Sequence, residues 1–223
     1  MSANVVSEGS NSVPVAFSDS AASERLVDIA SASADIGLDA AITSGALDGV
    51  PFFGAITGIA RAGIAIRDYL FLKKVAAFLE TFDKTPLEKR RAFVADLEKN
   101  GKKAEFGEQI LLLVDRMEDV EKPAIVARLI AAAAMGHLPL GKALRVAKIV
   151  DRAFVEDLKT LPRFQAGSPT NRLVADALFS VGLLTGNGLA MFEGDDTDRS
   201  GTTYHLNEYG QILVRYGLQV EAS

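Results

Sequence analysis

A glycine-rich apolar segment, residues 40–66, limits what this chain can fold into, because Asp48 and Arg61 are its only charged residues. Glycine costs a helix about 1 kcal/mol relative to alanine, so a segment that needed only to be helical would not repeat it. Such repetition at helical spacing leaves flat strips on which two helix backbones can approach closely. The segment therefore predicts tightly packed helices. The repeated small residues are Gly45, Gly49, Gly54, Gly58, Ala62 and Gly63.

Two settings for this segment stay open. Residues 49–66 are just long enough to span a bilayer, and Lys73 and Lys74 follow them, as at a cytoplasmic interface. Against a membrane span, Pro51 and the glycines weaken the helix, and burying Asp48 in lipid would cost roughly 3 kcal/mol. The alternative is a helical hairpin in a soluble core. The candidate residues for helix packing or membrane contact are Asp48, Gly54, Gly58, Arg61, Ala62 and Gly63.

The composition excludes several classes of protein. Because the chain has no cysteine, it can form neither disulfides nor thiolate metal sites, which fits a reducing compartment. Its net charge of −5 gives nucleic acid no overall attraction. Residues 1–22 lack Lys and Arg and are rich in Ser and Asn, so they do not resemble a secretory signal and predict a disordered tail.

Helical patterns dominate the chain after this tail. We expect a glycine-rich apolar helical segment over residues 23–66, a helical bundle over residues 67–162 and a small module over residues 163–223. The last helix of the bundle should cover residues 140–161, with one apolar face in the core. The side chains that this face should bury are Val146, Val150, Phe154 and Leu158.

The C-terminal module has a different pattern. A helix that starts near Pro169 is followed by two strand-like runs, residues 189–193 and 202–206, around an acidic turn. Asn207 should cap a last helix. This order is similar to the end of a winged-helix domain. We therefore expect a mainly α fold, a helical bundle with a small winged-helix-like module. The apolar residues of the module's first helix are Leu173, Ala177, Leu178 and Val181.

The acidic turn is the one candidate metal site. Asp196, Asp198 and Ser200 follow the spacing of the first half of an EF-hand loop, but Asn207 stands where that loop needs a bidentate Glu. We expect a solvated hairpin tip to which hard cations can bind weakly. We expect no cofactor. No nucleophile elbow or paired catalytic carboxylate is apparent in the sequence, so we expect a protein that is not an enzyme.

We do not expect nucleic acid as a partner. Residues 163–223 hold four Lys and Arg against seven Asp and Glu, and phosphate contacts dominate affinity for DNA. In the helix near Pro169, Arg172 is the only cation that could contact phosphate, and Asp176 lies beside it. We expect a protein partner or a homo-oligomer instead, while membrane contact stays open.

Two runs of the sequence carry a resemblance to known proteins. DGVPFFGAITGIARAGIAIRDYLFLKKVAAFLE and the later FGEQILLLVDRMEDVEKPAIVARLIAAAAM resemble a bacterial family of uncharacterised helical proteins with an "IP..G...AG..IRD.LFLKK" segment. A more distant likeness is to abortive-infection proteins, which join an apolar helical front to a winged-helix-like end. We expect a non-enzymatic bacterial effector or accessory protein, in phage defence or stress, that packs its helices against a membrane or a protein partner.

This reading implies a location in the bacterial cytoplasm, or peripheral to or inserted in the inner membrane. The alternative function is a soluble helical scaffold whose acidic C-terminal module mediates protein contact or dimerisation.

Overall fold

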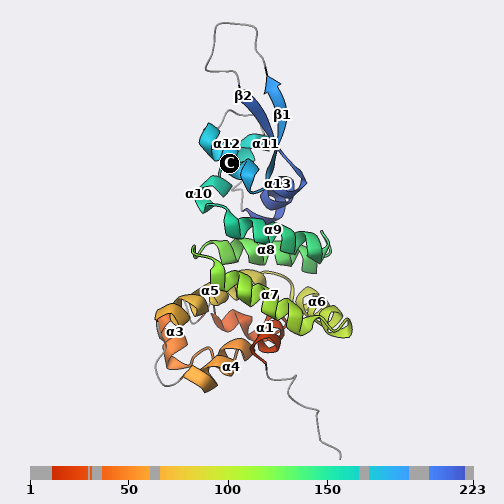
Figure 1. The fold of residues 1–223 in the computed structure, drawn as a ribbon. Helices are drawn as coiled ribbons and strands as arrows, with labels where there is room; N and C mark the ends of the chain where they lie inside the picture. The colour runs from red at the N-terminus through yellow and green to blue at the C-terminus, as the bar shows by residue number, and fades with distance from the viewer. Residues whose placement is uncertain are drawn as a thin grey trace, which may run out of the picture. The chain divides into compact units, whose positions relative to one another are not determined.

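Figure 1 shows the fold in a computed structural model, which describes residues 12–29, 31, 37–60, 66–165, 171–190 and 201–218. The chain is mainly helical, with a two-stranded antiparallel sheet near its C-terminus. The predicted mainly α fold with a small α/β part is thereby confirmed. The chain divides into two compact units, Met1–His137 and Leu138–Ser223. The bundle predicted over residues 67–162 is shared between these two units.

The described part of the first unit is built from helices. Helix α1 packs on α7 and α4, and α5 packs on α8 and α7. Helix α6 ends at Lys99, because Gly101 adopts a left-handed φ of 68° just after the cap residue Asn100. The elements are α1 (Val13–Ala21), the 3-10 helix η1 (Glu24–Leu26), α3 (Leu38–Ser44), α4 (Pro51–Ala60), α5 (Ile66–Asp83), α6 (Leu87–Lys99), α7 (Lys103–Arg116) and α8 (Lys122–Ala134).

Helix α1 corrects the second half of the disordered tail that the sequence predicted over residues 1–22, whereas residues 1–11 lie outside the described part. Phe17 in this helix is completely buried, and its ring centroid lies 6.0 Å from that of Phe52 and 5.5 Å from that of Phe78. The backbone N–H of Phe52 donates a hydrogen bond to Ser20 Oγ at 2.8 Å. Burying a phenylalanine side chain contributes about 1.5–3 kcal/mol. This helix therefore belongs to the core of the first unit, because its apolar contacts outweigh its serine-rich composition.

The backbone of α1 lies against α7 at Gly107. A Cβ atom at this position would overlap the carbonyl oxygen of Pro14 in α1, so only glycine fits. Beside this contact, Ser18 Oγ of α1 donates a hydrogen bond to the carbonyl oxygen of Lys103 at 2.9 Å. The sequence had placed such close packing in the glycine-rich segment, whereas Gly107 belongs to no repeat of small residues.

A buried arginine connects the end of α1 to α6. Arg90 is 4% exposed, and its guanidinium donates hydrogen bonds to three carbonyl oxygens and, at 2.8 Å, to the Asp83 carboxylate. Burial lowers the pKa of Arg90, and the charge of Asp83 raises it. Arginine stays protonated in proteins, so the group remains a cation with five donors. The three carbonyl groups belong to Ala21, Ser23 and Thr85.

The second unit combines short helices with a β-hairpin. Strands β1 and β2 pair antiparallel, from Leu184 opposite Leu206 to Ala190 opposite Gly201. The predicted hairpin is confirmed, although its first strand begins five residues before the predicted start at 189. The elements are α9 (Leu140–Arg152), α10 (Val155–Leu158), α11 (Leu161–Gln165), α12 (Arg172–Ser180), β1 (Leu184–Ala190), β2 (Gly201–Leu206), α13 (Glu208–Ile212) and the π-helical turn η2 (Leu213–Gly217).

Asn207 links the hairpin to the helices on either side of it. Its Oδ1 accepts hydrogen bonds from the backbone N–H groups of Tyr209 and Gly210, both at 3.0 Å, which confirms the predicted cap. Its Nδ2 donates to the carbonyl oxygen of Gly182 at 2.9 Å. The end of α12, the end of β2 and the start of α13 are thereby held at one side chain.

Candidate protein-docking surface

The structure describes the surroundings of two of the residues predicted for helix packing or membrane contact. Asp48 lies in the turn before α4, and a Cβ atom on Gly54 would lie 2.6 Å from the Asp48 carbonyl oxygen. Gly54 therefore lets α4 approach its own preceding turn. Among the described residues, no helix is both long and apolar enough to cross a bilayer. The surroundings of Gly58, and the residues Arg61, Ala62 and Gly63 themselves, lie outside the described part.

The predicted metal-binding turn also lies outside the described residues. This applies to Asp196, Asp198 and Ser200 alike. Within the described ranges, His, Asp and Glu residues form no group of three that could hold a metal ion.

Phe154 is the most exposed of the large apolar side chains in the described part, at 77%. The sequence predicted it to be buried in one helix over residues 140–161, and this prediction is wrong. Helix α9 ends at Arg152, Ala153 is extended with φ −92° and ψ 152°, and α10 starts at Val155. The break turns Phe154 outward, while the predicted core residues on either side of it stay buried. These are Val146, Val150 and Leu158.

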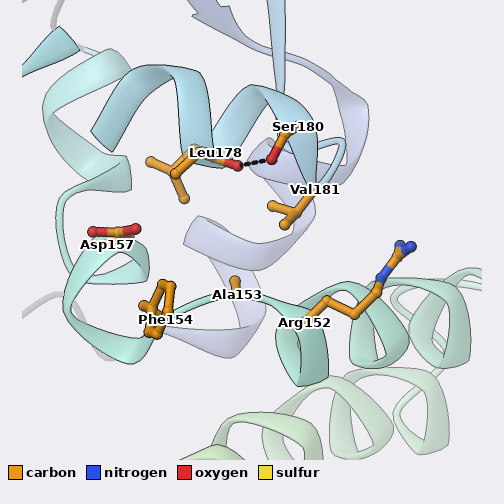
Figure 2. A pocket seen from close by; sticks show the side chains of 8 residues that line it. Arg152, Ala153, Phe154, Asp157, Leu178, Ser180 and Val181 are labelled. Atoms are coloured by element: carbon orange, nitrogen blue, oxygen red, sulfur yellow. Dashed lines mark hydrogen bonds between the residues drawn. The ribbon is translucent and has the colours of Figure 1, made fainter. Parts of the chain in front are cut away.

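A pocket lies beside Phe154, between the start of α10 and the end of α12 (Figure 2). Its volume of about 120 Å³ is below the roughly 300–1,000 Å³ of typical small-molecule sites. It is close to the roughly 150 Å³ of an apolar cavity that accepts a benzene ring. The pocket therefore suits one aromatic side chain. We call it the Phe154 pocket, and its lining residues are Arg152, Ala153, Phe154, Asp157, Ala177, Leu178, Ser180 and Val181.

The Phe154 pocket combines apolar walls with two opposite charges. Figure 2 shows Leu178 and Val181 on the α12 side of the pocket and Phe154 on the opposite side. Asp157 lies near Phe154, whereas Arg152 lies toward the end of α9 and extends away from the other lining residues. Neither the Arg152 guanidinium nor the Asp157 carboxylate forms an ion pair with another described residue. Both charges are therefore available to a group that enters from outside.

Helix α12, which forms one wall of the pocket, exposes two more large apolar side chains. Leu173 is 76% exposed and Phe179 is 48% exposed, although the sequence predicted Leu173 on the apolar stripe of this helix. The Phe179 ring lies 5.5 Å from the ring of Tyr204 in β2, and the Tyr204 hydroxyl donates a hydrogen bond to Asp176. These contacts fix α12 against the hairpin. The pocket thus has one wall on a helix that its neighbours hold in place.

No family model, curated protein or solved structure matches this chain.

Proposed function

We propose that the protein is a non-enzymatic bacterial accessory protein that binds a protein partner through the Phe154 pocket. The observation that carries this proposal is an aromatic ring with 77% of its surface exposed beside a pocket of one ring's size. Burying a phenylalanine side chain contributes about 1.5–3 kcal/mol, so a partner gains both by covering Phe154 and by filling the pocket. Buried aromatic anchors in such pockets supply most of the binding energy at protein interfaces.

The charges of the pocket favour a protein partner over a membrane. Asp157 is partly buried in the pocket wall, so lipid that covered Phe154 would also have to cover this carboxylate. A carboxylate in hydrocarbon costs roughly 3 kcal/mol on insertion scales. A protein partner can instead present a cation to Asp157 and an anion to Arg152.

We propose that α12, β1 and β2 form a winged-helix-like module that serves protein contact rather than DNA binding. Arg172 and Asp176 are the charged residues of α12, and Asp176 already accepts a hydrogen bond from Tyr204. One cation gives phosphate groups little attraction. We place the protein in the bacterial cytoplasm, and the sequence likeness favours phage defence or stress as its setting.

The proposal can be tested by photo-crosslinking in the bacterium that encodes the chain. Benzoyl-phenylalanine in place of Phe154 keeps an aromatic group at the pocket, and the same probe in place of the exposed Lys99 of α6 is the matched control. We expect a crosslinked protein from the probe at position 154 and none from the control. The captured protein, once identified and purified, should bind the wild-type chain and bind the Phe154→Asp variant at least about tenfold more weakly.

Equal crosslinking from both probes, or no product from position 154, would contradict the proposed function. So would a captured protein that binds Phe154→Asp as tightly as it binds the wild-type chain. The mass of the product also shows whether the partner is another protein or a second copy of this chain.

A further inference from the structure

The Phe154 pocket is bordered by a side chain of matching size, that of Phe154 itself. Phe154 exposes most of its ring, and the pocket that this ring borders has room for about one ring. The ring cannot fill the pocket of its own chain, because it forms part of the pocket wall. A projecting group and a hollow of matching size on one surface are the elements of a self-complementary contact, as in two-fold dimers.

We propose that a second copy of this chain occupies the Phe154 pocket, with Phe154 of each copy entering the pocket of the other. The inference rests on the proposed function and specifies its partner. In a two-fold contact, each Phe154 also borders the pocket that the other Phe154 enters. The two rings therefore meet at the symmetry axis, at the 4.5–7 Å between centroids that paired aromatic rings adopt.

The charges around the pocket fit the same two-fold arrangement. Arg152 and Asp157 have opposite signs and form no ion pair with a described residue of their own chain. In the proposed contact Arg152 of each copy pairs with Asp157 of the other, because both residues border the pocket and carry opposite charges. The neighbouring pair Lys159 and Glu156 is already joined at 2.9 Å and adds no net charge. A second copy therefore meets an opposite charge at both of these positions.

The first experiment measures the mass of the full chain by sedimentation equilibrium over a range of concentrations. We expect a monomer–dimer equilibrium for the wild type. Phe154→Asp should raise the dimer dissociation constant at least about 100-fold, because each dimer loses two anchoring rings. Leu173→Asp is the matched control, since Leu173 is equally exposed but does not line the pocket, and it should leave the dissociation constant within about threefold of the wild type.

The second experiment uses charge reversal and depends on the two-fold symmetry. Arg152→Asp places two carboxylates opposite each other at both ends of the contact, and Asp157→Arg places two guanidinium groups there, so each variant alone should be monomeric. Mixing the two variants pairs every new charge with an opposite one, so the mixture should form heterodimers. The doubly reversed chain, Arg152→Asp with Asp157→Arg, should again form homodimers. Circular dichroism of each variant establishes that it is folded.

A wild-type chain that stays monomeric, or dimers that Phe154→Asp leaves intact, would overturn the inference. Folded single-charge variants that stay monomeric when mixed would overturn the two-fold pairing of Arg152 with Asp157. If the crosslinking probe captures a different protein while the wild-type chain is monomeric, the proposed function stands and this inference fails. If the probe captures nothing and no dimer forms, both fail.

Discussion

Replacing Gly107 by alanine tests whether the backbones of α1 and α7 are in direct contact. In an unconstrained helix the change would stabilise the fold by about 1 kcal/mol, because alanine is the better helix former. At Gly107 the added methyl group would overlap the carbonyl oxygen of Pro14, so α1 has to shift away from α7. Overpacking of this kind typically costs about 1–3 kcal/mol.

Complete release of α1 would cost more than this. That release would expose Phe17, whose burial contributes about 1.5–3 kcal/mol, and break the hydrogen bond from Ser18 to Lys103, worth about 1 kcal/mol, among other contacts. A shift of α1 that keeps these contacts is less costly, so we expect Gly107→Ala to lower the free energy of unfolding by about 1–3 kcal/mol. For a chain of this size each kcal/mol shifts Tm by about 2–4 °C.

Urea unfolding followed by far-ultraviolet circular dichroism measures this change, and Gly141→Ala is the matched control. Gly141 also lies in a helix, α9, but a Cβ atom there would meet nothing within 4 Å, so the control should be neutral or stabilising by up to about 1 kcal/mol. The two costs of Gly107→Ala and Phe17→Ala should not add, because each weakens the same packing of α1. A Gly107→Ala protein as stable as Gly141→Ala would refute the close contact.

Two further predictions concern cations of the first unit. Arg90→Met should lower the free energy of unfolding by about 3–5 kcal/mol in urea titrations, because it leaves buried carbonyl groups and the Asp83 carboxylate without their donor, and Arg90→Lys should recover only part of this. Burial lowers the pKa of Lys103, but its contacts with Asp19 at 2.8 Å and Glu98 at 3.3 Å outweigh burial, so the pKa lies above its ordinary value of 10.5. The stability that protonated Lys103 contributes is therefore complete below pH 10.5 and is lost as the pH rises through its folded-state pKa. The Lys103→Met variant lacks this group, so its free energy of unfolding should fall less than that of the wild type in an alkaline series.

Sequence periodicity was sufficient where an element depends on its own residues. Helix α7 was predictable because Phe106, Ile110 and Val114 recur at helical spacing, and all three are buried. The Asn207 cap was predictable for the same reason, because a cap is made within three residues. Contacts between segments that are distant in the sequence produce no local pattern from which they could be predicted. Nothing near Gly107 in the sequence indicates that the carbonyl oxygen of Pro14 will lie against it.

The candidate site was missed for a related reason. Apolar spacing alone continues through Phe154, since Val146, Val150, Phe154 and Leu158 follow one helical stripe. Charge patterning marks the break that the apolar pattern hides. Arg152 is a cation in the last turn of α9, and Glu156 and Asp157 are anions in the first turn of α10. Cations at helix ends and anions at helix starts are favoured by the helix dipole, so Arg152, Glu156 and Asp157 fit a helix that ends and another that begins, whereas Asp151 in the same last turn of α9 does not.

The helix dipole also affects both variants of the charge-reversal experiment. Arg152→Asp puts an anion at the end of α9, and Asp157→Arg puts a cation at the start of α10, so each variant should lose about 0.3–1 kcal/mol of stability within its own chain. This loss is the same whether the variants are measured apart or together. A weaker dimer from either single variant therefore has two explanations, a less stable helix end or a repelled partner. Recovery of dimers on mixing has only one, because mixing changes the charges across the contact and leaves each chain's own helices as they were.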